Sequence, residues 1–234
     1  MDDPVPSGDE QGTVGLPPAV PLFPLPNVVL FPRAVLPLHI FEERYKAMTA
    51  DALNGDRLIA MALLQPGWEK CYYGRPQIDP VVCVGSIVSH ERLADGNYNL
   101  LLQGQMRARL VQEIPDENRL YRIASLKPLG ERPVMEIDLS AQRQRLIELF
   151  SNQTLSFTTL ATQFRKLLSG PWPTPDIADL IAFNYFDDVG LKQALLAELD
   201  VHKRVQRTVN ELESLRPQIR PPQQQSTLHP PSMN

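Results

Sequence analysis

The hydrophobic pattern of the chain changes once, near residue 130, from a β-type pattern to a helical one. Between residues 20 and 126, short apolar bursts alternate with Pro, Gly and Asp-Gly, which is typical of strands joined by tight turns. Asp95-Gly96 predicts a hairpin, and Gly85 predicts a bulge. The count is six or seven strands and one helix, a series that closes most naturally into a small barrel. Beyond the opening segment, the bursts predicted to be strands are 58–64, 81–89, 98–104, 107–111 and 121–126.

The opening segment, residues 20–41, holds five prolines among its apolar bursts. Because proline fixes φ and lacks an N–H, no helix is expected there, whereas strand edges, starts and kinks accommodate it. After Phe41 the residues favour a helix and contain no breaker. The segment therefore predicts a kinked strand, a turn, a second strand, and a helix over about 41–53 that Asn54-Gly55 ends in a left-handed conformation.

Helical periodicity dominates from residue 139 onward. Ser140 and Ser156 are predicted to cap two helices, and Thr174-Pro175 predicts a third helix start with proline in its first turn. Because none of these helices buries its apolar stripe alone, we expect them to pack together and onto the barrel. The last two helices are expected over 191–199 and 201–215.

These patterns predict an α+β fold in which a mixed β-barrel precedes a helical bundle. The expected organisation is a disordered tail over 1–19, a β-barrel subdomain with one helix over 20–130, a helical bundle over 134–215, and a disordered Pro/Gln-rich tail over 216–234.

The opening segment also resembles the start of the Lon N-terminal domain family. The resemblance rests on the runs PLFPL (21–25), VLFP (29–32) and LPLHIFE (36–42), followed by Arg44-Tyr45. It continues through VGSIV, the Asp-Gly turn, LLLQGQMRARL, ADLIAFNYF and LKQALLAELDVHKRVQRTVNEL, and covers about residues 20–215. The resemblance implies a PUA-like pseudobarrel, which the strand count independently permits. It also implies recognition of unfolded or degron-bearing polypeptide through apolar patches.

The composition of the chain indicates which kinds of partner and which cellular compartment to expect. The net charge of −4 and the absence of a basic stripe argue against a nucleic-acid-binding protein. No run approaches the roughly 18 apolar residues of a membrane span, and the acidic start lacks the apolar core of a signal peptide. Two cysteines make no disulfide framework, so we expect a reducing, cytoplasmic environment.

Candidate catalytic chemistry is sparse. The chain contains no GxxxxGK[ST] phosphate loop, and we expect a stand-alone form without the ATPase and serine–lysine peptidase domains of Lon proteases. Cys71 and Cys83 are twelve residues apart and the histidines are scattered, so no catalytic, cofactor-binding or metal-binding residue is nominated. Cys83 is expected to be a small buried hydrophobe, and His39 a hydrogen-bonded residue at a strand end. Glu42 is expected to pair with Arg44 or Arg33.

The best candidate contact residues are Trp68, Tyr72 and Tyr73, in the loop over 65–76. Loop aromatics supply rigid contact area, although they could equally fold back as a lid on the barrel.

The first functional hypothesis is a non-catalytic module that binds polypeptide, as an adaptor or holdase in protein quality control. The alternative is a small-molecule-binding or hydrolytic protein with a pocket between barrel and helices, and RNA binding ranks last. The expected partner is unfolded polypeptide or another protein, with no membrane, and the oligomeric state stays open, a homodimer included.

Overall fold

The computed structural model describes residues 15–71, 74–151 and 158–215, and the chain divides into two compact units. The first unit comprises Met1–Gly130 together with Asp188–Ala197, and the second comprises Glu131–Asp187 together with Glu198–Asn234. The helix α5 (Val189–Ala197) is therefore part of the first unit, although the helical sequence pattern around it runs on without a break.

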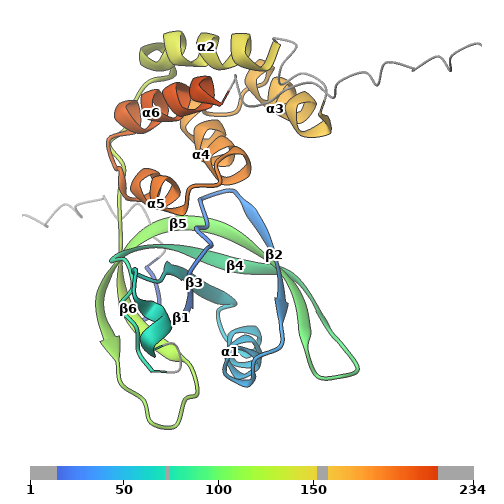
Figure 1. Cartoon of the computed structure of the whole chain (residues 1–234), viewed down its shortest axis with the longest axis vertical. Coiled ribbons are helices and arrows are strands. Elements are labelled where there is room, and N and C mark those ends of the chain that lie inside the picture. Colours follow the sequence, from blue (N-terminus) through green and yellow to red (C-terminus); the bar gives the residue numbers. More distant parts are fainter. Residues whose placement is uncertain (1–14, 72–73, 152–157, 216–234) are drawn as a thin grey trace, which may run out of the picture. The chain divides into compact units, whose positions relative to one another are not determined.

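Six strands form a mixed sheet that closes on itself (Figure 1). The order is β2-β5-β4-β3-β1-β6, and a further pairing between β5 and β6 completes the ring. Only β1 and β3 pair in parallel among these strands. The predicted α+β class with a mixed β pseudobarrel is confirmed. The strands are β1 (Val20–Leu25), β2 (Val35–Ile40), β3 (Leu58–Leu63), β4 (Val81–Arg92), β5 (Tyr98–Ile114) and β6 (Arg122–Pro128).

The long strand β5 organises the ring because it pairs with three partners. Its first part pairs with β2, its second part pairs with β6, and β4 lies along most of its length. The predicted hairpin joins β4 and β5, where Gly96 has a φ of +84°. The predicted bulge is also present, since the register of β4 against β5 shifts between Val84 and Gly85. The residues predicted as two strands over 98–104 and 107–111 are thus one strand.

The barrel interior is filled by small and medium apolar side chains. Its main cluster draws on β1, β3, β4, β5 and β6. The fully buried members of that cluster include Val20, Leu22, Ala60, Val82, Val84, Ala108 and Ala124.

Helix α1 (Glu43–Asn54) follows β2 and ends differently from the prediction. Gly55 has φ −116° and ψ −132°, so it is not left-handed. The positive φ lies instead at Arg57, at 58°. The amide of Arg57 donates to the Ala52 carbonyl at 2.9 Å, so the chain reverses two residues later than the Asn-Gly pair indicated.

The second unit contains α2 (Ser140–Ser151), α3 (Thr159–Ser169), α4 (Thr174–Tyr185) and α6 (Val201–Ser214). The predicted cap at Ser140 is wrong, because a 3-10 turn, η2 (Glu136–Leu139), runs directly into α2 and Ser140 is itself helical. Thr158 caps α3 by accepting from the Ala161 amide at 3.0 Å, while the predicted cap Ser156 lies outside the described residues.

The predicted start of α4 at Thr174-Pro175 is confirmed, but its cap comes from another element. Glu136, in η2, accepts a hydrogen bond from the Thr174 amide and another from the Thr174 hydroxyl, each at 2.7 Å. A carboxylate at this helix start is favoured by the positive end of the helix dipole. The 3-10 turn is thereby tied to α4.

A buried ionic cluster joins α4 and α6. Arg204 is 1% exposed, and its guanidinium lies 3.1 Å from the Asp179 carboxylate and 2.9 Å from that of Glu131. The same guanidinium donates to the Glu198 carbonyl at 2.8 Å. A buried charge is tolerated only when it is neutralised and hydrogen-bonded in this way.

Candidate functional site

The loop between β1 and β2 is fixed to the barrel rather than displayed for binding. Phe31 is fully buried, the Arg33 amide donates to the Gly104 carbonyl at 2.8 Å, and the Gly104 amide donates to the Ala34 carbonyl at 2.9 Å. This approach requires glycine at position 104, because a Cβ there would lie 2.0 Å from the Phe31 carbonyl oxygen. The apolar bursts of the opening segment therefore build the fold.

Two polar residues of the opening segment also have structural roles. His39 shares a hydrogen bond with Asn99 across β2 and β5, with 2.8 Å between Nδ1 and Oδ1. Glu42 forms an ion pair with Arg44 at 2.9 Å, one of the two pairings expected. The His39 bond is exposed and the Glu42 pair is partly buried, and both join residues at the strand-to-helix corner.

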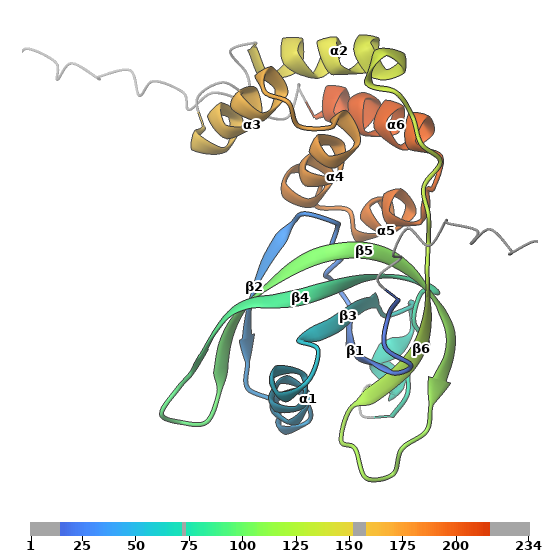
Figure 2. The same ribbon diagram turned by 180° about the vertical axis from the view of Figure 1, so that it is seen from behind.

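Strand β2 presents apolar side chains on both of its faces. Leu36, Leu38 and Ile40 turn inward, whereas Val35 and Pro37 are exposed. Pro37 pairs with Leu101 of β5, which is 39% exposed. Val88 of β4, at the register shift opposite Leu101, is 50% exposed. We call Val35, Pro37, Val88 and Leu101 the apolar sheet face. They belong to strands β2, β4 and β5, whose ribbons are also seen from behind in Figure 2.

A shallow cavity of about 410 Å³ adjoins the apolar sheet face. Its lining combines apolar residues of the face with polar groups at the end of the β4–β5 hairpin. The polar members are His39, Ser89, His90, Glu91 and Asn99. Strand β2 has only β5 as a sheet neighbour, so its other edge is unpaired within the described part of the sheet.

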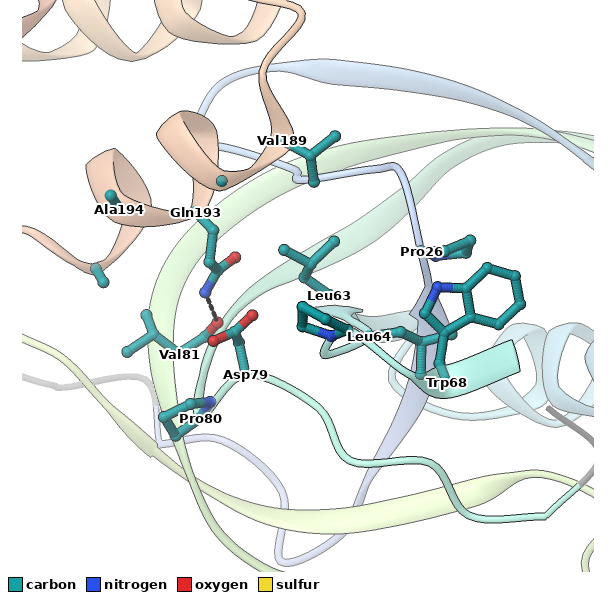
Figure 3. A pocket seen from close by; sticks show the side chains of 13 residues that line it. Pro26, Leu63, Leu64, Trp68, Asp79, Pro80, Val81, Val189, Gln193 and Ala194 are labelled. Carbon is teal, nitrogen blue, oxygen red and sulfur yellow. Dashed lines mark hydrogen bonds between the residues drawn. The ribbon is translucent and has the colours of Figure 1, made fainter. Parts of the chain in front are cut away.

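A second cavity lies at the opposite end of β4, beside Trp68 (Figure 3). Its volume is about 570 Å³, within the range of small-molecule sites. We call it the Trp68 pocket. Residues of the barrel and of α5 form its apolar walls, and these residues are Pro26, Leu63, Leu64, Val81, Val189, Ala194 and Ala197.

Trp68 lies against the barrel and beside the cavity. It lies in a 3-10 turn, η1 (Trp68–Cys71), packs as a half-buried side chain against the barrel core, and lines the pocket. Its indole thus covers part of the core and presents a surface to the cavity. Tyr72 and Tyr73, the other two candidate contact residues, lie outside the described residues.

Helix α5 is fixed to the barrel by two long-range hydrogen bonds. The Gln193 side-chain amide donates to the Val81 carbonyl at 2.9 Å, and the Arg107 Nε donates to the Leu196 carbonyl at 2.9 Å. Because Gln193 and Arg107 are both buried, these bonds determine where α5 lies on the rim. They complete one wall of the Trp68 pocket.

The described lining of the Trp68 pocket contains two side-chain acceptors, Asp79 and Gln193, besides the indole N–H of Trp68. Figure 3 shows the Asp79 carboxylate next to the Gln193 side chain, whose nitrogen is bonded to Val81 and whose oxygen remains an acceptor. Partial burial raises the pKa of the Asp79 carboxyl. Sequence patterns nominated neither residue, since Asp79 sits in an ordinary Asp-Pro turn and Gln193 is 112 residues away from the group that it contacts.

The two cysteines lie in different environments. Cys83 is fully buried, as expected, and Cys71 is exposed. Among the residues that the structure describes, no group of three or more His, Cys, Asp or Glu side chains could hold a metal ion. None of the helices in the described ranges is both long enough and apolar enough to span a membrane.

Comparison with known proteins decides the family. Residues 19–214 match the model of the ATP-dependent protease La (LON) substrate-binding domain. The chain belongs to this family. It is 28% identical over 206 residues to the Lon protease of Dictyoglomus thermophilum, covering 83% of this chain and 24% of that protein. It is 30% identical over 196 residues to Lon protease 2 of Myxococcus xanthus, covering 81% of this chain and 23% of that protein.

The chain thus spans about a quarter of the length of the curated Lon relatives it matches, whose catalytic domains lie outside the aligned region. Solved Lon structures share its fold. The N-terminal domain of the Mycobacterium avium complex Lon protease has a TM-score of 0.66 at 14% identity, covering 83% of this chain and 98% of that one. The Lon N-terminal domain protein from Xanthomonas campestris has a TM-score of 0.57 at 21% identity, covering 82% and 97%.

Proposed function

We propose that this Lon-type domain is a non-catalytic module that binds polypeptide segments exposed by unfolding or presented as degrons. The observation that carries the proposal is the apolar sheet face, where Val35, Pro37, Val88 and Leu101 are exposed on neighbouring strands. Membership in the LON substrate-binding domain family supports the same substrate class. Adaptor or holdase activity in cytoplasmic protein quality control is the physiological form that we infer for it.

The geometry of the face favours an extended polypeptide as the occupant. Unfolded chains expose alternating apolar side chains, and an unpaired strand edge such as that of β2 offers backbone groups for strand addition. The flanking polar groups around the cavity, which include His39, His90 and Glu91, leave the rim hydrated. An apolar strip with a polar rim is the usual anatomy of a protein-binding surface.

The experiment measures binding of a chemically unfolded, fluorescently labelled model protein, with its native form as a control. We expect micromolar binding to the unfolded form. Val88→Glu should weaken it at least about fivefold, because the exposed half of the Val88 side chain is no longer available for burial by the polypeptide and a charge is placed in the contact. The matched control is Val111→Glu. Val111 is 60% exposed and, like Val88, lies at a register shift, but it is outside the face.

Two further arms separate the alternatives. Trp68→Ala tests whether the loop aromatics, Trp68 with Tyr72 and Tyr73, form the polypeptide contact instead, in which case this variant and not Val88→Glu weakens binding. Single-stranded RNA tests the nucleic-acid alternative, whose mark is a steep dependence of affinity on salt. Equal binding by wild type, Val88→Glu and Val111→Glu would rule out the apolar sheet face as the polypeptide site.

A further inference from the structure

The described lining of the Trp68 pocket contains an acidic side chain but no basic one, a feature that has no role in polypeptide binding at the apolar sheet face. One ionisable side chain, Asp79, and no basic side chain occur among the described residues that line it. The other polar groups among the lining side chains are the Gln193 amide, whose nitrogen donates to the Val81 carbonyl, and the indole N–H of Trp68. The Asp79 carboxylate and the Gln193 side-chain oxygen are acceptors, and the carboxylate is the one charged group in this described lining, so the pocket favours a ligand with a cationic donor.

The positive end of the α5 helix dipole does not cancel the preference of the pocket for a cationic ligand. Val189 and Gly190, at the start of the helix, line the pocket, and a helix start by itself favours anions. However, the Asp188 carboxylate already caps this end, accepting from the Leu191 amide at 2.9 Å. The helix also lies along the pocket, since Ala194 and Ala197 line it as well. Asp79 therefore carries the one formal charge among the described side chains that line the pocket.

The size and the walls of the pocket define the rest of the ligand. A volume of about 570 Å³ holds more than an inorganic cation. The half-buried Trp68 indole forms one wall, and an aromatic face attracts both an apolar ring and an adjacent cation. Leu63 and Leu64 form the floor between Trp68 and Asp79 (Figure 3).

We propose that the Trp68 pocket binds a primary ammonium group carried on an apolar or aromatic body, with Asp79 as the counter-ion and Gln193 Oε1 as a second acceptor. The body lies against Trp68 and the leucines, and the ammonium lies at the Asp79 end. Two sources supply this chemistry, a small aromatic amine and the free α-amino end of a polypeptide that begins with an apolar residue. The proposal is independent of the apolar sheet face, which lies at the other end of β4.

The test uses the full chain with Trp172→Phe, so that Trp68 is the remaining tryptophan of the two in the sequence. The probe is 2-phenylethylamine, and 2-phenylethanol is its neutral counterpart. Titration followed by Trp68 fluorescence should show the amine binding about tenfold to a hundredfold more tightly than the alcohol, the range expected for a charge-assisted hydrogen bond. Asp79→Asn should reduce this preference to about twofold or less while the alcohol binds as before.

The matched control is Glu69→Gln, which removes an exposed carboxylate beside Trp68 that does not line the pocket and should leave the amine preference unchanged. Thermal unfolding of Asp79→Asn checks that the variant is folded. A phenylalanine-initiated peptide with a free amino end, compared with its acetylated form, then distinguishes the polypeptide source from the small amine. Equal affinity for amine and alcohol, or an amine preference that survives Asp79→Asn, would overturn the proposal.

Discussion

Substitution of Gly104 tests the contact that joins the opening loop to the barrel. A Cβ at position 104 would lie 2.0 Å from the Phe31 carbonyl oxygen, 2.8 Å from its carbonyl carbon and 3.2 Å from the Cys83 sulfur. The two shortest contacts are with backbone, which no side-chain rotation relieves. Gly104→Ala therefore has to move the loop that carries the buried Phe31 ring away from β5.

The magnitude follows from what this displacement breaks. Two backbone hydrogen bonds, Arg33 to Gly104 and Gly104 to Ala34, contribute about 1 kcal/mol each. Overpacking of the interior adds about 1–3 kcal/mol. We expect Gly104→Ala to lower the free energy of unfolding of the first unit, which we call the β unit, by about 3–5 kcal/mol. The φ of Gly104 lies outside the left-handed region, so this loss arises from the contact and not from backbone preference.

The assay is urea unfolding followed by Trp68 fluorescence in the Trp172→Phe background, because Trp68 belongs to the β unit and Trp172 to the other. Gly130→Ala is the matched control, since a Cβ there meets nothing within 4 Å. It should change the stability by less than about 0.5 kcal/mol. A loss below about 1 kcal/mol for Gly104→Ala would show that the loop moves freely and that its fixed approach is not a source of stability.

Two further predictions concern buried polar groups. Arg204→Met should lower the free energy of unfolding of the second unit, the helical unit, by about 3–5 kcal/mol, because the buried Asp179 loses this cation. Adding Asp179→Leu should restore most of the loss. Urea unfolding monitored by Trp172 fluorescence measures both variants, and a larger loss in the double variant would contradict the reasoning. Burial, followed by the hydrogen bond to Asp51, raises the pKa of Tyr121 from 10 to about 12. The folded state thus keeps this proton longer than the unfolded state, so the contribution to stability is complete below about pH 10 and is lost toward pH 12. Tyr121→Phe should remove this part of the alkaline decline in stability of the β unit, and an unchanged decline would exclude Tyr121 as its source.

The parts of the fold that sequence predicted are those fixed by neighbouring residues. The ring of strands follows from short apolar bursts and local turn chemistry, and the Asp95-Gly96 hairpin is one such case. A single long β5 was missed because Gly104 resembles an interruption, although the strand continues through it against β4. The glycine is there for the approach of Phe31, a contact between residues that the local pattern does not relate.

Other features could not be predicted because groups distant in sequence supply them. Glu136 supplies the cap of α4 from 38 residues away, and the same 3-10 turn removes the cap from Ser140. The Trp68 pocket depends on Gln193 and Val81 in the same way. The apolar sheet face, in contrast, had a readable signal, because a strand that is apolar on both faces needs cover on both sides.

Helix α5 links these observations energetically. It is bonded to the barrel through Gln193 and Leu196, and it supplies one wall of the Trp68 pocket. A ligand that contacts this wall binds only while α5 is docked on the barrel. Binding therefore stabilises the docked position of α5, and loss of that position weakens binding by the same free energy.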